Sequence, residues 1–328
     1  MKEISITRQE AGLRLDKFLA KYMSEAPKSF FYKMLRKKNI VLNGKKAEGM
    51  EKLKEGDCVK LFLADETIQK FRGMQKEESE LPVQKAELDI VFEDDDILVL
   101  NKPMGMLSQK ARKEDVSVIE HLLAYLAQSS PSENTTFRPG ICNRLDRNTT
   151  GLIVAGKTVQ GLQVMNRLFK ERDLKKYYLC LVKGKVEKKS RIDGYLLKDE
   201  KHNKVTVEKK SSEGAVRIIT EYEPLKSGLW QGEAYTLLKV HLITGKSHQI
   251  RAHLKSIGHP IVGDTKYGEK SVYHQFKKAF GVRYQLLHAW RLEFGSPAYL
   301  PEKYHNQVFE AKLPKNFKRV IEGIGIDS

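Results

Sequence analysis

A polar stretch at residues 65–86 divides this chain of 328 residues into two unequal parts. Over residues 65–85 the sequence contains acidic pairs such as Asp65-Glu66 and Glu77-Glu78, and it has few apolar side chains around Gly73. A segment of this composition is typical of a linker between domains. The chain is long enough for two domains. We therefore predict a small domain over residues 12–64, a linker over 65–86 and a larger domain over 87–328.

The first part shows the patterns of two helices followed by strands. A stripe of apolar residues at helical spacing predicts an amphipathic helix, formed by Leu15, Phe18, Leu19 and Tyr22. Ser29 is expected to cap a second helix. The run 40–44 (Ile-Val-Leu-Asn-Gly) predicts a strand that enters an Asn-Gly turn, and the alternation of Val59, Leu61 and Leu63 predicts another strand.

The charge of the chain is strongly positive. Its 59 Lys and Arg exceed its 42 Asp and Glu, which gives a formal net charge of +17 and a pI of about 9.5. Residues 1–63 alone hold 15 Lys and Arg against 8 Asp and Glu. A surplus of this size attracts polyanions, so nucleic acid or an anionic membrane surface is the expected kind of partner.

Two observations bear on the compartment of the protein. No stretch approaches the roughly 18 consecutive apolar residues that would span a bilayer, and residues 1–5 lack the apolar core of a signal peptide. Cys58, Cys142 and Cys180 are widely separated and odd in number, which argues against a disulfide framework. We therefore predict a cytoplasmic protein without membrane contact.

The second part opens with a predicted hairpin. Apolar runs at 88–92 and 97–100 flank the acidic turn 93–96 (Glu-Asp-Asp-Asp). Three consecutive aspartates at a turn point in different directions, so we do not expect them to bind a metal ion. A helix is predicted over 116–126, and strands are predicted around 176–182, 215–222 and 235–242.

The densest chemistry lies in residues 140–154, where Asp146 stands between Arg144 and Arg147 in a polar loop that runs into an apolar strand. Nearby guanidinium groups favour the ionised carboxylate, which is the form that a nucleophile needs. The same pattern also occurs in structural ion pairs. The overlapping run 151–158 matches the spelling of a phosphate-binding loop, but its Leu-Ile-Val-Ala centre favours an extended strand instead of a cradle of backbone amides.

A third cluster, residues 244–264, holds three histidines and an arginine. His248, His253 and His259 are spaced by five and six residues, which does not place them on one helical face, so we expect histidines that form hydrogen bonds and predict no metal site. Arg251 lies in a half-apolar, helix-compatible run. Burying it is costly without a carboxylate or phosphate partner.

Taken in order, these segments resemble the large-subunit ribosomal-RNA pseudouridine synthase family over about residues 88–300. The likeness rests on Asn101-Lys102-Pro103-x-Gly105, on Asn143-Arg144-Leu145-Asp146-Arg147-x-Thr149-x-Gly151-Leu152, on Lys176-x-Tyr178, on Thr244-Gly245 through His248-Gln249-Ile250-Arg251, and on Leu287-His288-Ala289-Trp290-Arg291-Leu292. Residues 12–63 resemble the RNA-binding module of the S-four ribosomal-protein type, through the run 14–19 (Arg-Leu-Asp-Lys-Phe-Leu) and the Asn43-Gly44 turn.

The resemblance implies an α+β fold: a catalytic domain with a mixed, largely antiparallel sheet and a central cleft, and a small N-terminal α/β module. It implies an enzyme that isomerises specific uridines to pseudouridine in structured RNA, with large-subunit ribosomal RNA as the expected substrate and without a metal or an organic cofactor. We also expect a monomer. Asp146 would be the nucleophile, Tyr178 would stack on the base and assist proton transfer, and Arg251 would pair with Asp146. Arg144 would occupy the space that the flipped nucleotide leaves.

Further RNA contacts are expected from a set of basic and polar residues: Arg147, Asn143, Lys176, Arg14, Lys17, Arg36, Lys37 and Lys38. Two positions depart from the family pattern, because Asn143 stands where a histidine is usual and Cys142 where a valine is common. The sequence does not choose among attack on the base, attack on the sugar and a glycal route. Two alternatives from other classes stay open: a non-catalytic protein of RNA binding or ribosome assembly, and a nucleotide-dependent enzyme.

Overall fold

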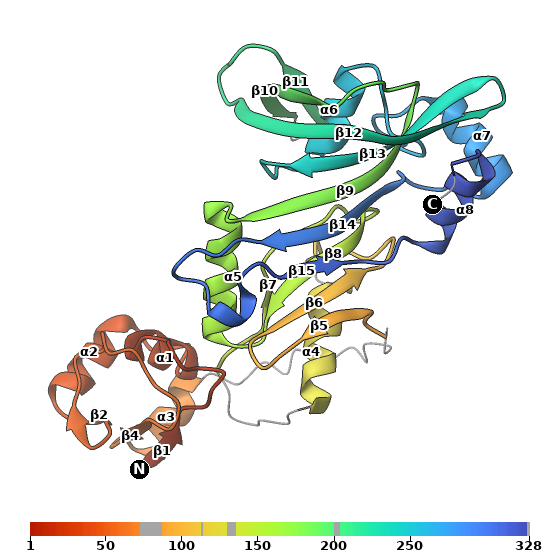
Figure 1. The fold of residues 1–328 in the computed structure, drawn as a ribbon. Helices are drawn as coiled ribbons and strands as arrows, with labels where there is room; N and C mark the ends of the chain where they lie inside the picture. The colour runs from red at the N-terminus through yellow and green to blue at the C-terminus, as the bar shows by residue number, and fades with distance from the viewer. Residues whose placement is uncertain (73–86, 113, 130–135, 200–203, 327–328) are drawn as a thin grey trace.

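The computed structural model describes residues 1–72, 87–112, 114–129, 136–199 and 204–326. The N-terminal module is a four-stranded antiparallel sheet with three helices (Figure 1). Its strand order is β1-β4-β2-β3. The elements are β1 (Lys2–Ser5), α1 (Leu15–Tyr22), α2 (Lys28–Arg36), β2 (Ile40–Leu42), β3 (Lys45–Lys46), β4 (Cys58–Leu61) and α3 (Asp65–Arg72).

The predicted elements of this module form with small shifts. The apolar stripe of α1 is buried in the module's own core, as its spacing predicted. Asn43 and Gly44 both have positive φ angles, as a two-residue turn between β2 and β3 requires. The prediction that Ser29 caps the second helix is wrong: α2 already begins at Lys28, and Pro27 is its N-cap. Proline fixes φ near the value a helix start needs, so it can take that place.

The segment 65–72, predicted to belong to the linker, is instead the helix α3. Ile68 is 5% exposed in the core of the module, and the Phe71 ring lies 4.7 Å from the Phe30 ring between centroids. Two apolar residues three apart suffice to anchor a polar helix to an existing core, which composition alone does not reveal. The rest of the predicted linker, residues 73–86, lies outside the described residues.

The larger part of the chain is built on one sheet of 11 strands. The strand order is β11-β10-β12-β13-β9-β14-β8-β6-β5, with β15 beside β14 and β7 beside β8. Only the β14–β8 pair is parallel among the described strand pairs, so the sheet is mixed and largely antiparallel, as expected. The strands are β5 (Ile90–Glu93), β6 (Ile97–Lys102), β7 (Gly140–Ile141), β8 (Thr150–Gly156), β9 (Leu174–Lys183), β10 (Ser190–Asp199), β11 (Lys204–Glu208), β12 (Val216–Trp230), β13 (Glu233–Leu242), β14 (Leu287–Phe294) and β15 (Val308–Glu310).

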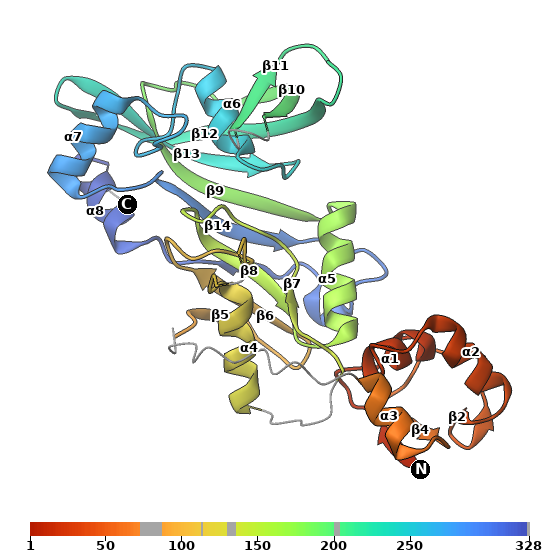
Figure 2. The same ribbon diagram turned by 180° about the vertical axis from the view of Figure 1, so that it is seen from behind.

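Helices cover both faces of this sheet (Figures 1 and 2). They are α4 (Val118–Ser129), α5 (Val159–Glu171), α6 (Gln249–Ser256), α7 (Lys270–Phe280), the short 3-10 helix η1 (Glu302–Tyr304) and α8 (Lys315–Gly323). Residues of α4 and α6 pack with Tyr178, Cys180 and Val182 of β9 on one face, which we call the front. Leu181 of β9 points the other way and packs with α7 and α8. This alternation follows from the two-residue period of a strand.

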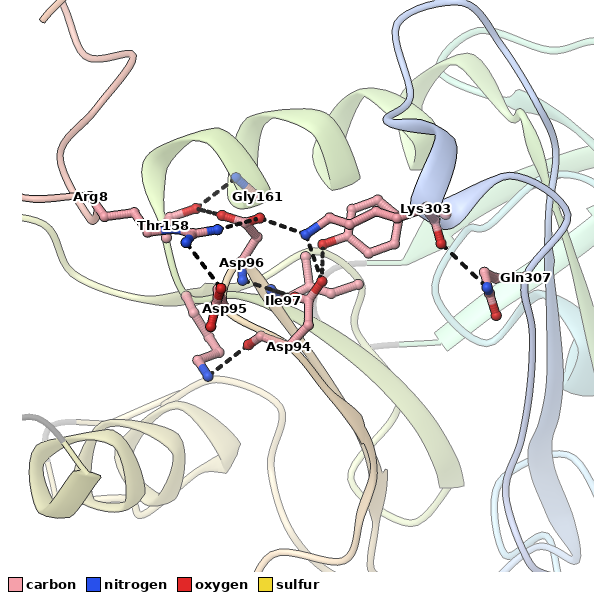
Figure 3. A network of polar contacts seen from close by, with 11 residues as sticks. Arg8, Asp94, Asp95, Asp96, Ile97, Thr158, Gly161, Lys303 and Gln307 are labelled. Carbon is pink, nitrogen blue, oxygen red and sulfur yellow. Dashed lines mark hydrogen bonds and ion pairs between the residues drawn. The ribbon is translucent and has the colours of Figure 1, made fainter. Parts of the chain in front are cut away.

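The acidic turn between β5 and β6 forms the predicted hairpin and is held by cations and hydroxyl groups (Figure 3). The Lys303 Nζ donates to Asp94 Oδ2 at 2.7 Å and to Asp96 Oδ2 at 2.8 Å. Thr158, the N-cap of α5, donates to Asp96. Burial raises the pKa of Asp94, but the hydrogen bonds from Lys303 and its other partners outweigh it and lower that pKa to about 2. The aspartates thus bind protein groups within the described part of the chain.

The acidic turn also contacts the N-terminal module. Arg8 of the module lies 3.0 Å from Asp95 and 3.4 Å from Asp96, measured between guanidinium nitrogens and carboxylate oxygens. The buried Glu10 accepts hydrogen bonds from the backbone N–H and hydroxyl of Thr136 at 2.7 and 2.9 Å. The Val159 N–H donates to the Gln9 carbonyl. Residues 8–10 therefore dock the module against the start of α5 and the β5–β6 turn.

The run that spells a phosphate-binding loop is an ordinary strand. Residues 151–156 belong to β8, pair with β6 along their length and are fully buried. Thr158 then caps α5 through a hydrogen bond from the Gly161 N–H to its hydroxyl. Because the backbone amides of β8 are used in the sheet, they cannot cradle a phosphate, as the sequence predicted.

Candidate active site

Asp146 lies in the loop before β8, and two buried side chains clamp the residues on either side of it. The hydroxyl of Ser108 accepts from the Leu145 N–H at 3.0 Å and donates to the Leu145 carbonyl at 2.8 Å. The Nζ of Lys102, whose side chain is fully buried, donates to the Arg147 carbonyl at 2.9 Å. The backbone around Asp146 is thereby fixed, although its own side chain is 25% exposed.

Lys102 also donates to the carbonyls of Pro103 and Met106, each at 2.9 Å. Burial lowers the pKa of Lys102 to about 7, and the charge of Asp146 opposes this shift. Three carbonyl acceptors match the three N–H donors of the ammonium form. This lysine therefore ties the Asn-Lys-Pro segment at the end of β6 to the loop of Asp146.

Gly151, just after this loop, allows β8 to approach β14 closely. Its φ is +113°, and a Cβ atom there would lie 2.2 Å from the Ala289 carbonyl oxygen. This is the point where β8 and β14 pair in parallel. A side chain at this position would push the Asp146 loop away from β14. Close packing of β8 against β14 therefore requires glycine at this position of the motif.

Arg251, on α6, is held between two carboxylates. Its Nε and Nη2 donate to Asp264 Oδ2 and Oδ1 at 2.7 and 2.9 Å, and its Nη1 donates to Asp146 Oδ2 at 2.9 Å. The Arg251 side chain is 8% exposed and that of Asp264 is fully buried. Arg251 thus has two carboxylate partners, whereas the sequence argument required only one.

The electrostatics of this group follow from its geometry. Burial alone lowers the pKa of Arg251, but the hydrogen bonds and charge of Asp264, followed by those of Asp146, raise it above its usual value. Burial raises the pKa of Asp264, and its bonds from Arg251 and from the Tyr267 and Lys266 amides lower it overall. Arg251 therefore stays charged and presents a fixed donor to Asp146.

Tyr178, on β9, faces the same side of the sheet and is 8% exposed. Burial, followed by the negative charge of Asp146, raises the pKa of its hydroxyl well above the usual value. The hydroxyl therefore stays protonated near neutral pH. The structure brings Tyr178 and Arg251 to Asp146 from β9, α6 and the loop before β8, which lie far apart in the sequence.

The other residues predicted for the site differ from one another in exposure and in hydrogen-bond partners. Asn143 uses its side chain to continue the edge of β8, because its Nδ2 donates to the Leu152 carbonyl and its Oδ1 accepts from the Val154 N–H. Arg144 and Arg147 are exposed, and the Arg147 Nε donates to the Gly105 carbonyl. Lys176 is half-buried on β9, and burial followed by the charge of Arg172 lowers its pKa to about 8.

In the N-terminal module, Arg14 differs from the other expected RNA contacts. It binds Asp16 of α1 through Nε and Nη2 at 3.1 and 2.7 Å, so part of its donor capacity is used within the module. The remaining four expected contacts, Lys17, Arg36, Lys37 and Lys38, are exposed. Their roles stay predictions.

The three histidines of the third cluster form hydrogen bonds within the protein. His253 contacts the Thr220 hydroxyl at 2.8 Å, His259 contacts the Lys183 carbonyl at 3.0 Å, and His248 contacts the Tyr267 hydroxyl at 3.0 Å. In the described ranges, no three His, Cys, Asp or Glu side chains are grouped so that they could hold a metal ion. Also within those ranges, no helix is long and apolar enough to cross a bilayer.

Sequence reasoning missed the residues that position the site. Asp264 is the last residue of the third cluster, and the need of Arg251 for a partner was the signal that could have identified it. Lys102 was noted only as part of a motif. Neither Ser108 nor Tyr267 carries a local signal, because each acts through a contact distant in sequence.

Comparisons with known proteins identify relatives of this chain. Residues 96–256 match the family described as RNA pseudouridylate synthase. The chain is 32% identical over 321 residues to the ribosomal large subunit pseudouridine synthase C of Vibrio parahaemolyticus, covering 95% of this chain and 94% of that protein. It is 33% identical to the protein of the same name from Escherichia coli K12, covering 90% and 89%. These likenesses favour an enzyme and give no support to a non-catalytic RNA-binding protein.

Solved structures show the same fold. The structure of human RNA pseudouridylate synthase domain containing 4 aligns with a TM-score of 0.58 at 22% identity, over 73% of this chain and 94% of that one. That of human RNA pseudouridylate synthase domain containing 1 aligns with a TM-score of 0.51 at 23% identity, over 73% and 95%. With the relatives similar over nearly their whole length, the chain belongs to the RNA pseudouridine synthase family and is an isomerase that acts on RNA.

Proposed function

We propose that this enzyme converts specific uridines of large-subunit ribosomal RNA to pseudouridine, with Asp146 as the nucleophile. The substrate proposal is supported by the names of the two bacterial relatives, which match this chain over 90% or more of its length. The nucleophile proposal is supported by the position of one carboxylate. Asp146 is partly exposed, while its partner Arg251 and the Asp264 carboxylate that binds Arg251 are buried.

The contact between Arg251 and Asp146 is the strongest support for Asp146 as the nucleophile. A carboxylate attacks only when it is ionised and held in place. The Nη1 of Arg251 binds one oxygen of Asp146 at 2.9 Å, and Asp264 fixes the guanidinium from behind. The second oxygen of Asp146 is the one available for attack.

A uridine inside an RNA helix cannot present its glycosidic bond to this carboxylate, so the nucleotide must leave the stack. The exposed side chain of Arg144 stands two residues before Asp146 and can enter the vacated space. Tyr178 offers a ring on which the flipped base can stack, and its protonated hydroxyl can assist proton transfer. These two contacts would offset part of the few kcal/mol that unstacking costs.

The reaction exchanges one bond of the sugar for another. The bond from C1′ to N1 of uracil breaks, a bond from C1′ to C5 forms, C5 loses its proton and N1 gains one. Substrate and product have the same atoms and the same oxidation state, so no oxidant or reductant is consumed. Asp146 can begin this exchange by attack on the base or on the sugar, or by helping to form a glycal.

We also propose that the exposed basic residues of the N-terminal module bind the RNA backbone beside the target. The docking of residues 8–10 would give this contact a fixed distance from Asp146. Three free cysteines are compatible with action in the cytoplasm.

The test is a map of pseudouridines in total RNA from cells that lack this chain. We expect one or more sites in large-subunit ribosomal RNA to be lost, restored by the unchanged gene, and not restored by Asp146→Asn. The control is Asp193→Asn, which alters an exposed carboxylate paired with Arg217 and should restore the sites fully.

The map separates the parts of the proposal. If pseudouridines were lost only from transfer RNA, the proposal that large-subunit ribosomal RNA is the substrate would be wrong. If Asp146→Asn restored the lost sites, the proposal that Asp146 is the nucleophile would be wrong. Tyr178→Phe keeps the ring and removes the hydroxyl, so turnover at the unchanged rate would leave Tyr178 with a stacking role only.

A further inference from the structure

His248 holds a strained backbone conformation next to Asp146. It immediately precedes α6 and has φ and ψ angles of 55° and 13°, in the left-handed region that few residues other than glycine adopt. Its side chain is 12% exposed, and its Nε2 lies 3.8 Å from Asp146 Oδ2. Strain of this kind persists where the surroundings hold the residue firmly.

Tyr267 provides that hold and also determines which ring nitrogen carries the proton. The Tyr267 hydroxyl accepts from the Val205 N–H at 2.9 Å and lies 3.0 Å from His248 Nδ1. In the part of the chain that the structure describes, Nδ1 is the one acceptor recorded for the hydroxyl hydrogen. The hydroxyl therefore donates to Nδ1, and a neutral ring then carries its proton on Nε2.

The charged groups around the ring keep it neutral. Burial lowers the pKa of His248, the charge of Asp146 raises it, and the charges of Arg251 and Lys266 lower it further, with a smaller opposing effect from Asp264. The net direction is downward. Near neutral pH the ring therefore directs a neutral N–H toward the same Asp146 oxygen that binds Arg251.

We infer that His248 is a positioning residue for Asp146, which approaches its carboxylate with a neutral Nε2–H, and that Tyr267 acts through His248 by fixing this tautomer. The inference rests on the proposed role of Asp146 as the nucleophile. At 3.8 Å the donor is too far away for a hydrogen bond in the free enzyme. It comes within range when RNA binding moves the carboxylate by less than an ångström, as catalytic contacts often tighten in the substrate complex.

Such a donor would interact with the Asp146 carboxylate while its charge changes during the reaction. When one oxygen of Asp146 forms a bond to the substrate, the carboxylate loses its charge, and it regains that charge when the bond breaks. A neutral donor on the other oxygen follows this change without the strong ground-state attraction of a second cation. Arg251 alone would leave this oxygen with one fixed partner.

The experiment compares His248→Asn with His248→Gln in single-turnover assays at saturating RNA. Asparagine tolerates the left-handed backbone but is too short to reach Asp146, whereas the amide nitrogen of glutamine can reach the position of Nε2. We expect His248→Asn to slow the rate roughly 10- to 100-fold, the usual effect of losing a hydrogen bond to a charged group. His248→Gln should recover to within about 5-fold of the unchanged enzyme, with RNA affinity unaltered in both.

Tyr267→Phe tests the tautomer. It should slow the unchanged enzyme by about 3- to 10-fold, as expected for one neutral hydrogen bond, and have no further effect in the His248→Asn background. The control is His241→Asn, on β13 beside Glu221 and on the opposite face of the sheet from Tyr178, which should leave the rate unchanged.

Each outcome decides between the two proposals. Full rate in His248→Asn, equal loss in the Asn and Gln variants, or additive losses with Tyr267→Phe would each overturn the inference. Asp146→Asn is assayed in parallel. If that variant turns over at the unchanged rate, the proposed function is wrong as well, whereas an inactive Asp146→Asn with a fully active His248→Asn overturns the present inference alone.

Discussion

Asp264 binds Arg251 through both of its carboxylate oxygens, and this buried pair lies one hydrogen bond away from Asp146. The chain contains the same bidentate geometry at its surface, where Arg217 binds Asp193 at 3.0 and 2.7 Å. The two pairs therefore differ mainly in burial.

This difference gives the first prediction. Asp264→Asn leaves a buried guanidinium without its main counter-charge and should lower the free energy of unfolding by about 3 kcal/mol or more. Asp193→Asn removes the matched exposed pair and should lower the free energy of unfolding far less, because solvent screens an exposed ion pair. Denaturant unfolding of both variants measures the contrast. Equal losses would mean that burial does not determine the contribution of Asp264.

A second prediction concerns Lys102. Lys102→Met removes the donors of three carbonyls, including that of Arg147 next to Asp146. We expect the free energy of unfolding to fall by about 3 kcal/mol and the turnover rate to fall at least roughly 10-fold, because buried acceptors lose their partners. The control is Lys110→Met, an exposed lysine that lies 3.6 Å from Glu120. Unchanged turnover in folded Lys102→Met would show that this lysine does not hold the catalytic loop.

The fold was largely readable from the sequence where the pattern is local. The stripe of α1, the Asn43-Gly44 turn and the β5–β6 hairpin each follow from spacing or turn chemistry within a few residues. The helix α3 was missed because its composition is polar and Ile68 gains its burial only from a core built elsewhere in the chain.

For the site, motif and physical reasoning identified Asp146 and the need of Arg251 for a carboxylate. The choice of Asp264 as its second partner, and the contacts of Tyr267 and Ser108, depend on which loops the sheet brings together. No periodicity encodes such contacts, because they join residues from separate elements. The docking of Arg8 on the acidic turn was missed for the same reason, since the opposite charges lie 87 and more residues apart.

Stability should fall in mild acid because two buried histidines resist protonation. Burial lowers the pKa of His253 and of His288 to about 4, and both side chains are fully buried. An unfolded chain binds these protons near pH 6.5, so the free energy of unfolding falls as pH drops from about 6.5 toward 4. Each histidine should account for roughly 2 kcal/mol between pH 7 and pH 5.

Unfolding curves at these two pH values test the histidines one at a time. His253→Gln and His288→Gln should each remove its share of the pH dependence. The control is His274→Gln on the exposed side of α7, which should leave it unchanged. A pH dependence that persists in full in both buried variants would rule out this explanation.

RNA binding by the N-terminal module predicts a change in salt dependence. Changing four of its exposed basic residues to alanine should weaken binding to structured RNA and make the slope of log affinity against log salt shallower by about 0.9 for each lost phosphate contact. The altered residues are Lys17, Arg36, Lys37 and Lys38. The control set lies on α7 and α8 and consists of Lys270, Lys277, Lys278 and Lys318. Equal slopes for the two sets would show that the module does not hold RNA.

Every catalytic role proposed for this enzyme depends on Asp146 as the nucleophile. The most direct measurement is the single-turnover rate of pseudouridine formation by Asp146→Asn on its mapped RNA, together with the affinity of the variant for that RNA. The amide is nearly isosteric with the carboxylate but is a poor nucleophile. We predict that isomerisation is abolished while folding and RNA affinity stay close to those of the unchanged enzyme; substantial turnover by Asp146→Asn would contradict the account.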